Sequence, residues 1–292
     1  MQRPIVALAA FTLGMAFAAS AVAQSAAPAP ASAPASLTPE RIAVGNYQVQ
    51  MALAGSGRYT VLFESGFGTD LNTWRQVAPA VAASARVLTY SRAGHGASEA
   101  RAAPRTILQN SEELDQLIAA AKLSPPFILV GHSYGGLLAR AFALRHPDWI
   151  AGMVLVDPSD ERFNPGLRKL DAARAADDDR RFAAIVPPKF QPELQQLQPV
   201  LDSGSFPIGG RLPDVPVVVL TSVRQADKPE FFLETPQAVA LKRSLHADFL
   251  RQFSDGSQVV TEKSGHFIQR EQPELVIAAI QQVIAAADKR RQ

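Results

Sequence analysis

Ser133 lies in the segment 127–136, FILVGHSYGG, where an apolar run ends in a Gly-x-Ser-x-Gly turn and a helix-like stretch follows. This pattern predicts a nucleophile elbow, a strained strand-to-helix turn that lifts a serine hydroxyl clear of the backbone. Neighbours two residues away crowd such a turn, so Gly131 and Gly135 are the residues that fit. The unpaired amides at the start of the following helix favour an anion beside Ser133. The indicated chemistry is nucleophilic attack by a serine.

The elements around this turn alternate between apolar strands and amphipathic helices. Such alternation predicts an α/β fold with a mostly parallel sheet and helices on both faces. The expected strands are 59–64, 86–90, 127–130, 150–157, 215–220 and 258–261, and the expected helices are 71–83, 106–121, 136–146 and 273–287.

Residues from about 158 to 214 interrupt the alternation and mix helical stretches with proline-rich breaks. The insert begins at the carboxyl end of an expected strand, where ligands bind in open α/β sheets. We therefore predict a helical cap over the active site, the alternative being a surface excursion unrelated to substrate. Four phenylalanines of the insert suggest an apolar acyl pocket or the cap's own core: Phe163, Phe182, Phe190 and Phe206.

Four short motifs in these elements resemble those of the α/β-hydrolase superfamily, and specifically its small serine esterase and perhydrolase-like branch with a helical cap. They are the loop at 64–68, the turn at 91–98, the elbow at 131–135 and the segment at 264–267. The resemblance extends from about residue 58 to 287. It implies an α/β-hydrolase fold in which nucleophile, acid and histidine follow one another along the chain.

His266 is the general base that this resemblance implies, because it follows the last expected strand and comes after the elbow. A serine hydroxyl is a poor nucleophile until a nearby imidazole takes its proton. The other histidines are interpreted as structural or peripheral, with His132 pointing into the fold and His246 on the surface or facing the cap. They are His95, His132, His146 and His246.

The acid of the triad has two main candidates. Asp157 stands directly at the tip of the expected strand 150–157, a position that some families of the superfamily use. Asp227 comes after the strand ending near Leu220, where many relatives place the acid, but it lies late for that position. We favour Asp157, with Asp227 as the alternative and Asp160 or Glu161 behind them.

Backbone amides carry the oxyanion hole in this superfamily, and the resemblance assigns the N–H groups of Phe67 and Tyr134 to it. Relatives often have histidine before the loop glycine, where this chain has Ser65. Glu64 is unusual beside such a site, and we expect its side chain to hydrogen-bond the loop backbone.

The N-terminal segment 1–23 predicts a signal peptide, with Arg3 before an apolar stretch and a small-x-small pattern that favours cleavage after Ala23. An uncleaved membrane anchor is the alternative. Residues 24–40, rich in Ala, Pro and Ser, predict a flexible linker, and residues 41–292 the hydrolase domain. The mature protein is therefore expected to be exported, periplasmic or secreted, without stable membrane insertion.

The composition narrows the chemistry further. The chain has 292 residues, a net charge of +2, no long basic run and no cysteine. Nucleic acid is therefore excluded as an expected partner, as are disulfides, thiol catalysis and thiolate metal sites. No metal or organic cofactor is implied, and the oligomeric state is not predicted.

The leading hypothesis is an exported serine hydrolase that cleaves small-molecule carboxylic esters through an acyl-serine intermediate. The same triad would serve an aminopeptidase, for which Glu161 could bind the substrate amine, or a C–C bond hydrolase. A non-catalytic binding protein of the same fold is the hypothesis from a different class.

Overall fold

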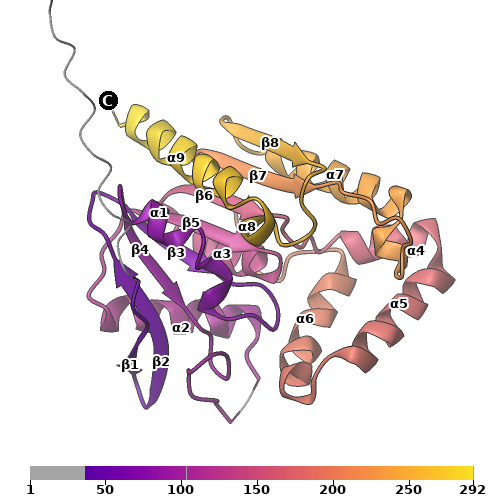
Figure 1. Cartoon of the computed structure of the whole chain (residues 1–292), viewed down its shortest axis with the longest axis horizontal. Helices are drawn as coiled ribbons and strands as arrows, with labels where there is room; N and C mark the ends of the chain where they lie inside the picture. Colours follow the sequence, from indigo (N-terminus) through magenta and orange to yellow (C-terminus); the bar gives the residue numbers. More distant parts are fainter. Residues whose placement is uncertain (1–36, 103, 292) are drawn as a thin grey trace, which may run out of the picture. The chain divides into compact units, whose positions relative to one another are not determined.

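The computed structural model describes residues 37–102 and 104–291 (Figure 1). Among these residues, eight strands form one sheet in the order β1-β2-β4-β3-β5-β6-β7-β8. The pairs β1–β2 and β2–β4 are antiparallel, and every other pair is parallel. The strands are β1 (Glu40–Val44), β2 (Tyr47–Ala54), β3 (Thr60–Glu64), β4 (Arg86–Tyr90), β5 (Phe127–His132), β6 (Ile150–Val156), β7 (Val217–Ser222) and β8 (Gly256–Thr261). The predicted mostly parallel sheet is confirmed.

The central strands lack polar alternation because both faces of the sheet are covered. All residues of β3, β5 and β7 are buried. One apolar core joins the sheet to α2, α3 and the end of α7, and a second core joins the opposite face to η1, α1, α8 and α9. These helices are η1 (Leu71–Trp74), α1 (Ala78–Val81), α2 (Ile107–Ala120), α3 (Tyr134–Arg145), α7 (Pro236–Leu250), α8 (Ile268–Glu271) and α9 (Pro273–Lys289). The expectation of helices on both faces is thereby confirmed.

The parallel register brings the carboxyl ends of three neighbouring strands to one edge. His132, the last residue of β5, pairs with Val156 at the end of β6. Val156 in turn pairs with Leu220 of β7. The residues that follow β5 and β6, Ser133 and Asp157, therefore emerge side by side at this edge, where open α/β sheets bind ligands.

The insert after β6 forms helices that gather on one side of the domain (Figure 1). They are α4 (Phe163–Leu170), α5 (Ala172–Ile185), η3 (Pro188–Phe190) and α6 (Gln191–Ser203). Leu197 of α6 packs in a cluster with Tyr134 and Leu137 of α3, and Phe67 lies against the same cluster. Helix α6 therefore packs against the end of the sheet that carries the elbow.

Several elements differ from the sequence expectations. The antiparallel strands β1 and β2, the short η2 (Pro147–Trp149) and η4 (Phe232–Glu234), and helix α7 were not predicted. The helix expected over 71–83 is split into η1 and α1, since Pro79 occupies the first turn of α1 and cannot continue a preceding helix.

The predicted signal peptide, 1–23, and most of the predicted linker lie outside the described residues. In the ranges that the structure describes, no helix is long and apolar enough to cross a membrane.

Candidate active site

Ser133 occupies a strained turn between β5 and α3. Its backbone has φ 52° and ψ −120°, a conformation that residues other than glycine rarely adopt. The crowding expected of an elbow is present on both sides. A Cβ added at Gly131 would lie 2.4 Å from the Gly135 carbonyl oxygen, and one added at Gly135 would lie 2.2 Å from the Glu64 carbonyl oxygen. Only glycine fits at these two positions, so the fold holds Ser133 at the edge where the strands end.

Asp157, at the tip of β6, lies within hydrogen-bond distance of His266. The distance from His266 Nδ1 to Asp157 Oδ2 is 2.7 Å, and the Ser222 N–H donates to Oδ1 at 3.0 Å. Burial opposes ionisation of Asp157, but Lys242 and His266 outweigh it and hold the pKa of this carboxyl well below its usual range. Asp227 is exposed in a loop after β7 and has no contact with His266. The structure thus brings Asp157, and not Asp227, to the histidine.

Lys242 of α7 is a third member of this cluster that the sequence analysis did not single out. Its Nζ lies 2.9 Å from Oδ2 of Asp157, the oxygen that also faces the imidazole. The signal in the sequence is weak, because a lysine in an amphipathic helix is ordinarily solvated.

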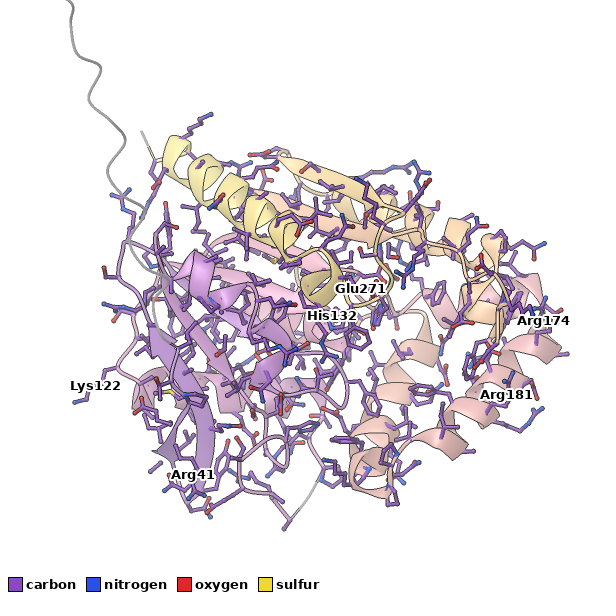
Figure 2. The ribbon with its side chains drawn as sticks, in the orientation of Figure 1. Arg41, Lys122, His132, Arg174, Arg181 and Glu271 are labelled. Carbon is purple, nitrogen blue, oxygen red and sulfur yellow. The ribbon has the colours of Figure 1, made fainter. Side chains whose placement is uncertain are left out.

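The loop carrying His266 is held against the elbow by His132. The His132 Nε2–H donates to the His266 carbonyl oxygen at 2.9 Å, and the two rings have centroids 4.7 Å apart. Burial, followed by the neighbouring His266, lowers the pKa of His132 to about 3, so this ring is neutral. Figure 2 shows His132 within the body of the domain, and its side chain is buried. His132 therefore points into the fold, as predicted.

The hydroxyl of Ser133 makes no hydrogen bond within residues 37–102 and 104–291. The His266 side chain is 48% exposed, and within the same residues its Nε2 has no hydrogen-bond partner. Catalytic hydrogen bonds are often long before substrate binds and shorten in the reacting complex. Among the described residues, Ser133 and His266 make no hydrogen bond with each other.

Two backbone amides beside Ser133 are free. Tyr134 is the first residue of α3, and the N–H groups of a first helical turn have no intrahelical partner. In the described part of the chain, neither the Tyr134 N–H nor the Phe67 N–H donates a hydrogen bond. These are the amides assigned to the oxyanion hole by resemblance.

Glu64 does not contact the loop backbone, so that expectation is wrong. Its side chain is buried and accepts a 2.6 Å hydrogen bond from the Tyr90 hydroxyl, while Oε2 has no partner. Burial raises the pKa of Glu64 to about 7, although the nearby Arg92 guanidinium and the hydrogen bond from Tyr90 act in the opposite direction. A carboxyl in this setting is neutral below that pH.

Two further expectations need correction. The surface position expected as one alternative for His246 is wrong: the side chain is buried and bonds to Thr221 Oγ1 and to the carbonyl oxygen of Pro158, the first residue of the insert, each at 2.9 Å. Glu161 is paired with Arg140 through contacts of 2.7 and 2.9 Å, so it has no free oxygen for a substrate amine.

The phenylalanines of the insert separate into two groups. The rings of Phe182 and Phe190 lie 6.1 and 6.3 Å from the ring of Phe67. Phe163 instead packs with α4, α5 and α7, and Phe206 packs in the cluster formed by α3 and α6. The aromatic wall near the free amides is therefore formed by Phe67, Phe182 and Phe190.

The chain belongs to the α/β hydrolase superfamily. A model of that family, described as alpha/beta hydrolase fold, matches residues 59–201. The matched span runs from β3 through the elbow to α6. The resemblance found in the sequence is confirmed, and the family with its esterase and lipase members supports hydrolase activity.

Two relatives are similar to much of this chain. The uncharacterized protein YqjL of Bacillus subtilis is 29% identical over 246 residues, which is 80% of this chain and 86% of YqjL. Lipase LipV of Mycobacterium tuberculosis is 28% identical over 215 residues, covering 64% of this chain and 78% of LipV.

Solved structures share the fold at low sequence identity. A thermophilic esterase from Thermogutta terrifontis has a TM-score of 0.57 and 20% identity, covering 86% of this chain and 99% of the esterase. The enol-lactonase from Burkholderia xenovorans has a TM-score of 0.60 and 18% identity, covering 84% of this chain and 100% of the lactonase.

Proposed function

We propose that this protein is a serine hydrolase that cleaves carboxylic esters through an acyl-serine intermediate. Ser133 is the nucleophile, His266 the general base and acid, and Asp157 the carboxylate that orients the imidazole. The observation that carries the proposal is the 2.7 Å contact between His266 and a fully buried Asp157, beside a serine in a strained elbow.

The reaction follows from the positions of these groups. His266 Nε2 takes the proton of the Ser133 hydroxyl as Oγ attacks the ester carbonyl carbon. The carbonyl oxygen becomes an anion, and the free N–H groups of Phe67 and Tyr134 are the donors available to stabilise it. The tetrahedral adduct collapses when the C–O bond to the alcohol breaks and His266 returns the proton to the departing oxygen. Water then attacks the acyl-serine by the same route and releases the acid.

The free energies involved are substantial. A preorganised oxyanion donor typically lowers the barrier by about 3 kcal/mol. Asp157 contributes by holding one tautomer of the imidazole, with the proton on Nδ1, and by stabilising the cation that forms. Because Asp157 is buried and its pKa is lowered, it remains ionised throughout the pH range in which the enzyme is expected to work.

Substrate class and location are also part of the proposal. The esterase and lipase among the relatives favour esters, and the aromatic residues Phe67, Phe182 and Phe190 favour an apolar acyl group. The predicted signal peptide favours export. Export is tested by recovering the protein from outside the cytoplasm and finding that its N-terminus is Gln24, whereas an N-terminus at Met1 would contradict cleavage.

Hydrolysis of a p-nitrophenyl ester series from C2 to C12 tests the activity. The native protein is expected to turn over at least part of the series, and the Ser133→Ala variant is expected to lose that turnover. Equal rates for the two proteins would contradict the proposal. No turnover by the native protein, together with no labelling by a fluorophosphonate, would favour a non-catalytic binding protein instead.

A further inference from the structure

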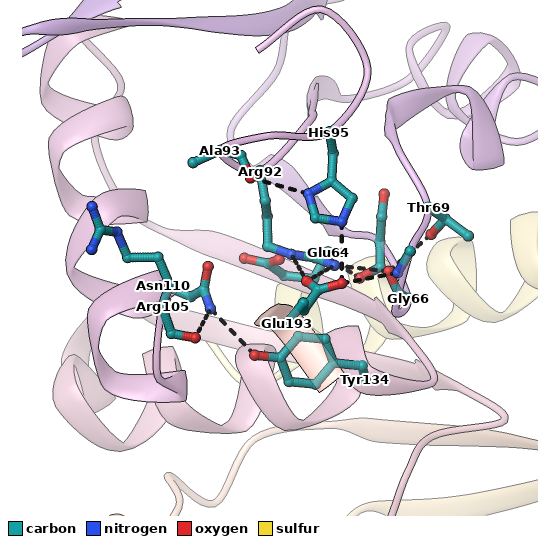
Figure 3. A network of polar contacts seen from close by, with 12 residues as sticks. Glu64, Gly66, Thr69, Arg92, Ala93, His95, Arg105, Asn110, Tyr134 and Glu193 are labelled. Atoms are coloured by element: carbon teal, nitrogen blue, oxygen red, sulfur yellow. Dashed lines mark hydrogen bonds and ion pairs between the residues drawn. The ribbon is translucent and has the colours of Figure 1, made fainter. Parts of the chain in front are cut away.

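Glu193 is a buried carboxylate on the cap helix α6, far from any strand end in sequence. Its side chain is only 11% exposed. Oε1 accepts hydrogen bonds from Arg92 Nε at 3.0 Å and Nη2 at 2.8 Å, and Oε2 accepts from the Gly68 N–H at 2.9 Å. His95 Nε2 lies 3.1 Å from Oε2. Figure 3 shows the Glu193 carboxylate between Arg92, His95 and the loop that contains Gly66 and Thr69.

The ionised state of Glu193 follows from these contacts. Burial raises the pKa of its carboxyl, but Arg92, His95 and the Gly68 N–H outweigh burial and lower the pKa to about 2. A carboxylate with a desolvated guanidinium and a backbone donor forms strong, directional hydrogen bonds. The cap is thus attached to the core domain through a charged contact at the loop formed by residues 65–69.

Arg92 extends the contact to the carbonyl groups of the same loop. Its Nη1 donates to the Ser65 carbonyl oxygen at 2.6 Å, and its Nη2 donates to the Gly66 carbonyl oxygen at 2.8 Å. Thr69 Oγ1 also donates to the Gly66 oxygen, at 3.0 Å. The guanidinium therefore connects Glu193 with two successive peptide groups of the loop.

These contacts determine which amide of the loop is free. In a planar trans peptide the C=O and the next N–H point in opposite directions. Because the Gly66 carbonyl is held toward Arg92, the Phe67 N–H is directed away from it. The next amide, the Gly68 N–H, is occupied by Glu193. Phe67 is left as the donor available to an oxyanion.

We infer that Glu193 is a positioning residue that orders the oxyanion loop from the cap, so that the Phe67 donor is correctly placed only while α6 is docked. The inference rests on the proposed function, because it concerns how one of the proposed oxyanion donors is placed. Rearrangement of α6 would remove the Glu193 carboxylate from both the Arg92 guanidinium and the Gly68 N–H. The cap would then control the rate of the chemical step in addition to shaping the acyl pocket.

Amide hydrogen exchange, followed by mass spectrometry, tests the anchoring without requiring activity. Glu193→Gln preserves the volume of the side chain but removes its charge, and Glu193→Ala removes the contact entirely. Glu113→Gln is the matched control, because it removes the charge of another largely buried carboxylate, paired with Arg105, that does not touch the loop. Peptides covering residues 65–69 are expected to exchange faster in both Glu193 variants and at the native rate in the control.

Kinetics on a p-nitrophenyl ester supply the second readout. Glu193→Gln is expected to lower kcat by about tenfold, part of the effect of losing a donor, while KM changes by less than about twofold. Inhibition by phenylboronic acid, whose serine adduct also occupies the oxyanion hole, should weaken by a similar factor. Glu113→Gln should show neither effect.

The outcomes separate the two proposals. Native exchange at 65–69 in both Glu193 variants, or faster exchange with unchanged kcat and boronate inhibition, overturns the positioning role. If the native protein hydrolyses no ester and binds no boronate, the proposed function fails. The exchange of residues 65–69 then still decides whether Glu193 anchors the loop.

Discussion

The ammonium group of Lys242 lies 2.9 Å from Oδ2 of Asp157. The same oxygen faces Nδ1 of His266 at 2.7 Å, so one carboxylate oxygen is shared between the ammonium group and the imidazole. Asp157 is fully buried and Lys242 is 23% exposed, so solvent screens this contact incompletely. The charge that stabilises a protonated imidazole is therefore partly neutralised before the reaction begins.

Replacing Lys242 by methionine removes this competing cation while retaining much of the side chain's length. Without this cation less charge opposes the burial of Asp157, so the pKa of the Asp157 carboxyl rises and its carboxylate is lost at a higher pH. The acid limb of the kcat/KM profile is expected to move upward by about half a pH unit. Lys169→Met, at an exposed position of α4, is the control and should leave the profile unchanged. A downward movement in Lys242→Met would contradict the arrangement.

Asp157→Asn tests the assignment of the acid. The amide keeps the shape of the side chain but cannot hold the productive tautomer, so kcat is expected to fall on the order of 10⁴-fold. Asp227→Asn, in the exposed loop after β7, is expected to retain native turnover. Steady-state kinetics on one ester compares the two variants. A large loss in the second with activity retained in the first would reverse the assignment.

Glu64 predicts a pH dependence of stability. The folded chain keeps the proton of Glu64 up to about pH 7, whereas the unfolded chain releases it near the ordinary value of 4.5. The folded state binds more protons in this window, so this residue lowers the free energy of unfolding as pH rises, by at most about 1.4 kcal/mol per pH unit. The Glu64→Gln variant, which can still accept from Tyr90, should show a weaker fall.

Urea denaturation between pH 4.5 and 7.5 measures this difference, with Glu112→Gln as a control at an exposed position of α2. The control is expected to follow the native profile. Parallel profiles for the native protein and Glu64→Gln would mean that Glu64 ionises normally in the folded state.

Gly135→Ala tests the packing of the elbow. The added methyl would lie 2.2 Å from the Glu64 carbonyl oxygen, a backbone atom that cannot move alone. We expect destabilisation of about 3 kcal/mol or more, visible as a lower Tm. Gly209→Ala is the control, since a Cβ there meets nothing within 4 Å. Similar Tm values for the two variants would refute the crowding argument.

The features that the sequence could predict are those carried by local patterns. Ser133 was identified from its glycine neighbours, and Asp157 from its place at the tip of an apolar strand. Both positions follow from the geometry of parallel strands, whose carboxyl ends meet at one edge. The fold class was predictable for the same reason, because fully buried strands require covering helices.

The features that were missed depend on contacts between distant segments. Glu193 and Arg92 are separated by 101 residues in the sequence. Charged side chains such as these are ordinarily exposed to solvent, so neither residue alone predicts a buried ion pair. Helix α7 escaped prediction because it buries polar His246 beside apolar residues, which obscures its periodicity. Lys242 was missed with it. Strand β1 is the edge strand of the sheet, where exposed residues weaken the apolar pattern, and β2 lies next to it and alternates buried with half-buried residues over its first half.

The most direct test of the central claim is the site of covalent modification by a fluorophosphonate. The native protein should gain the mass of one phosphonyl group, and peptide mapping should place it on Ser133. The Ser133→Ala variant should remain unmodified under the same conditions. Modification at another residue, or a native protein that stays unlabelled while folded, would contradict an activated serine at this site.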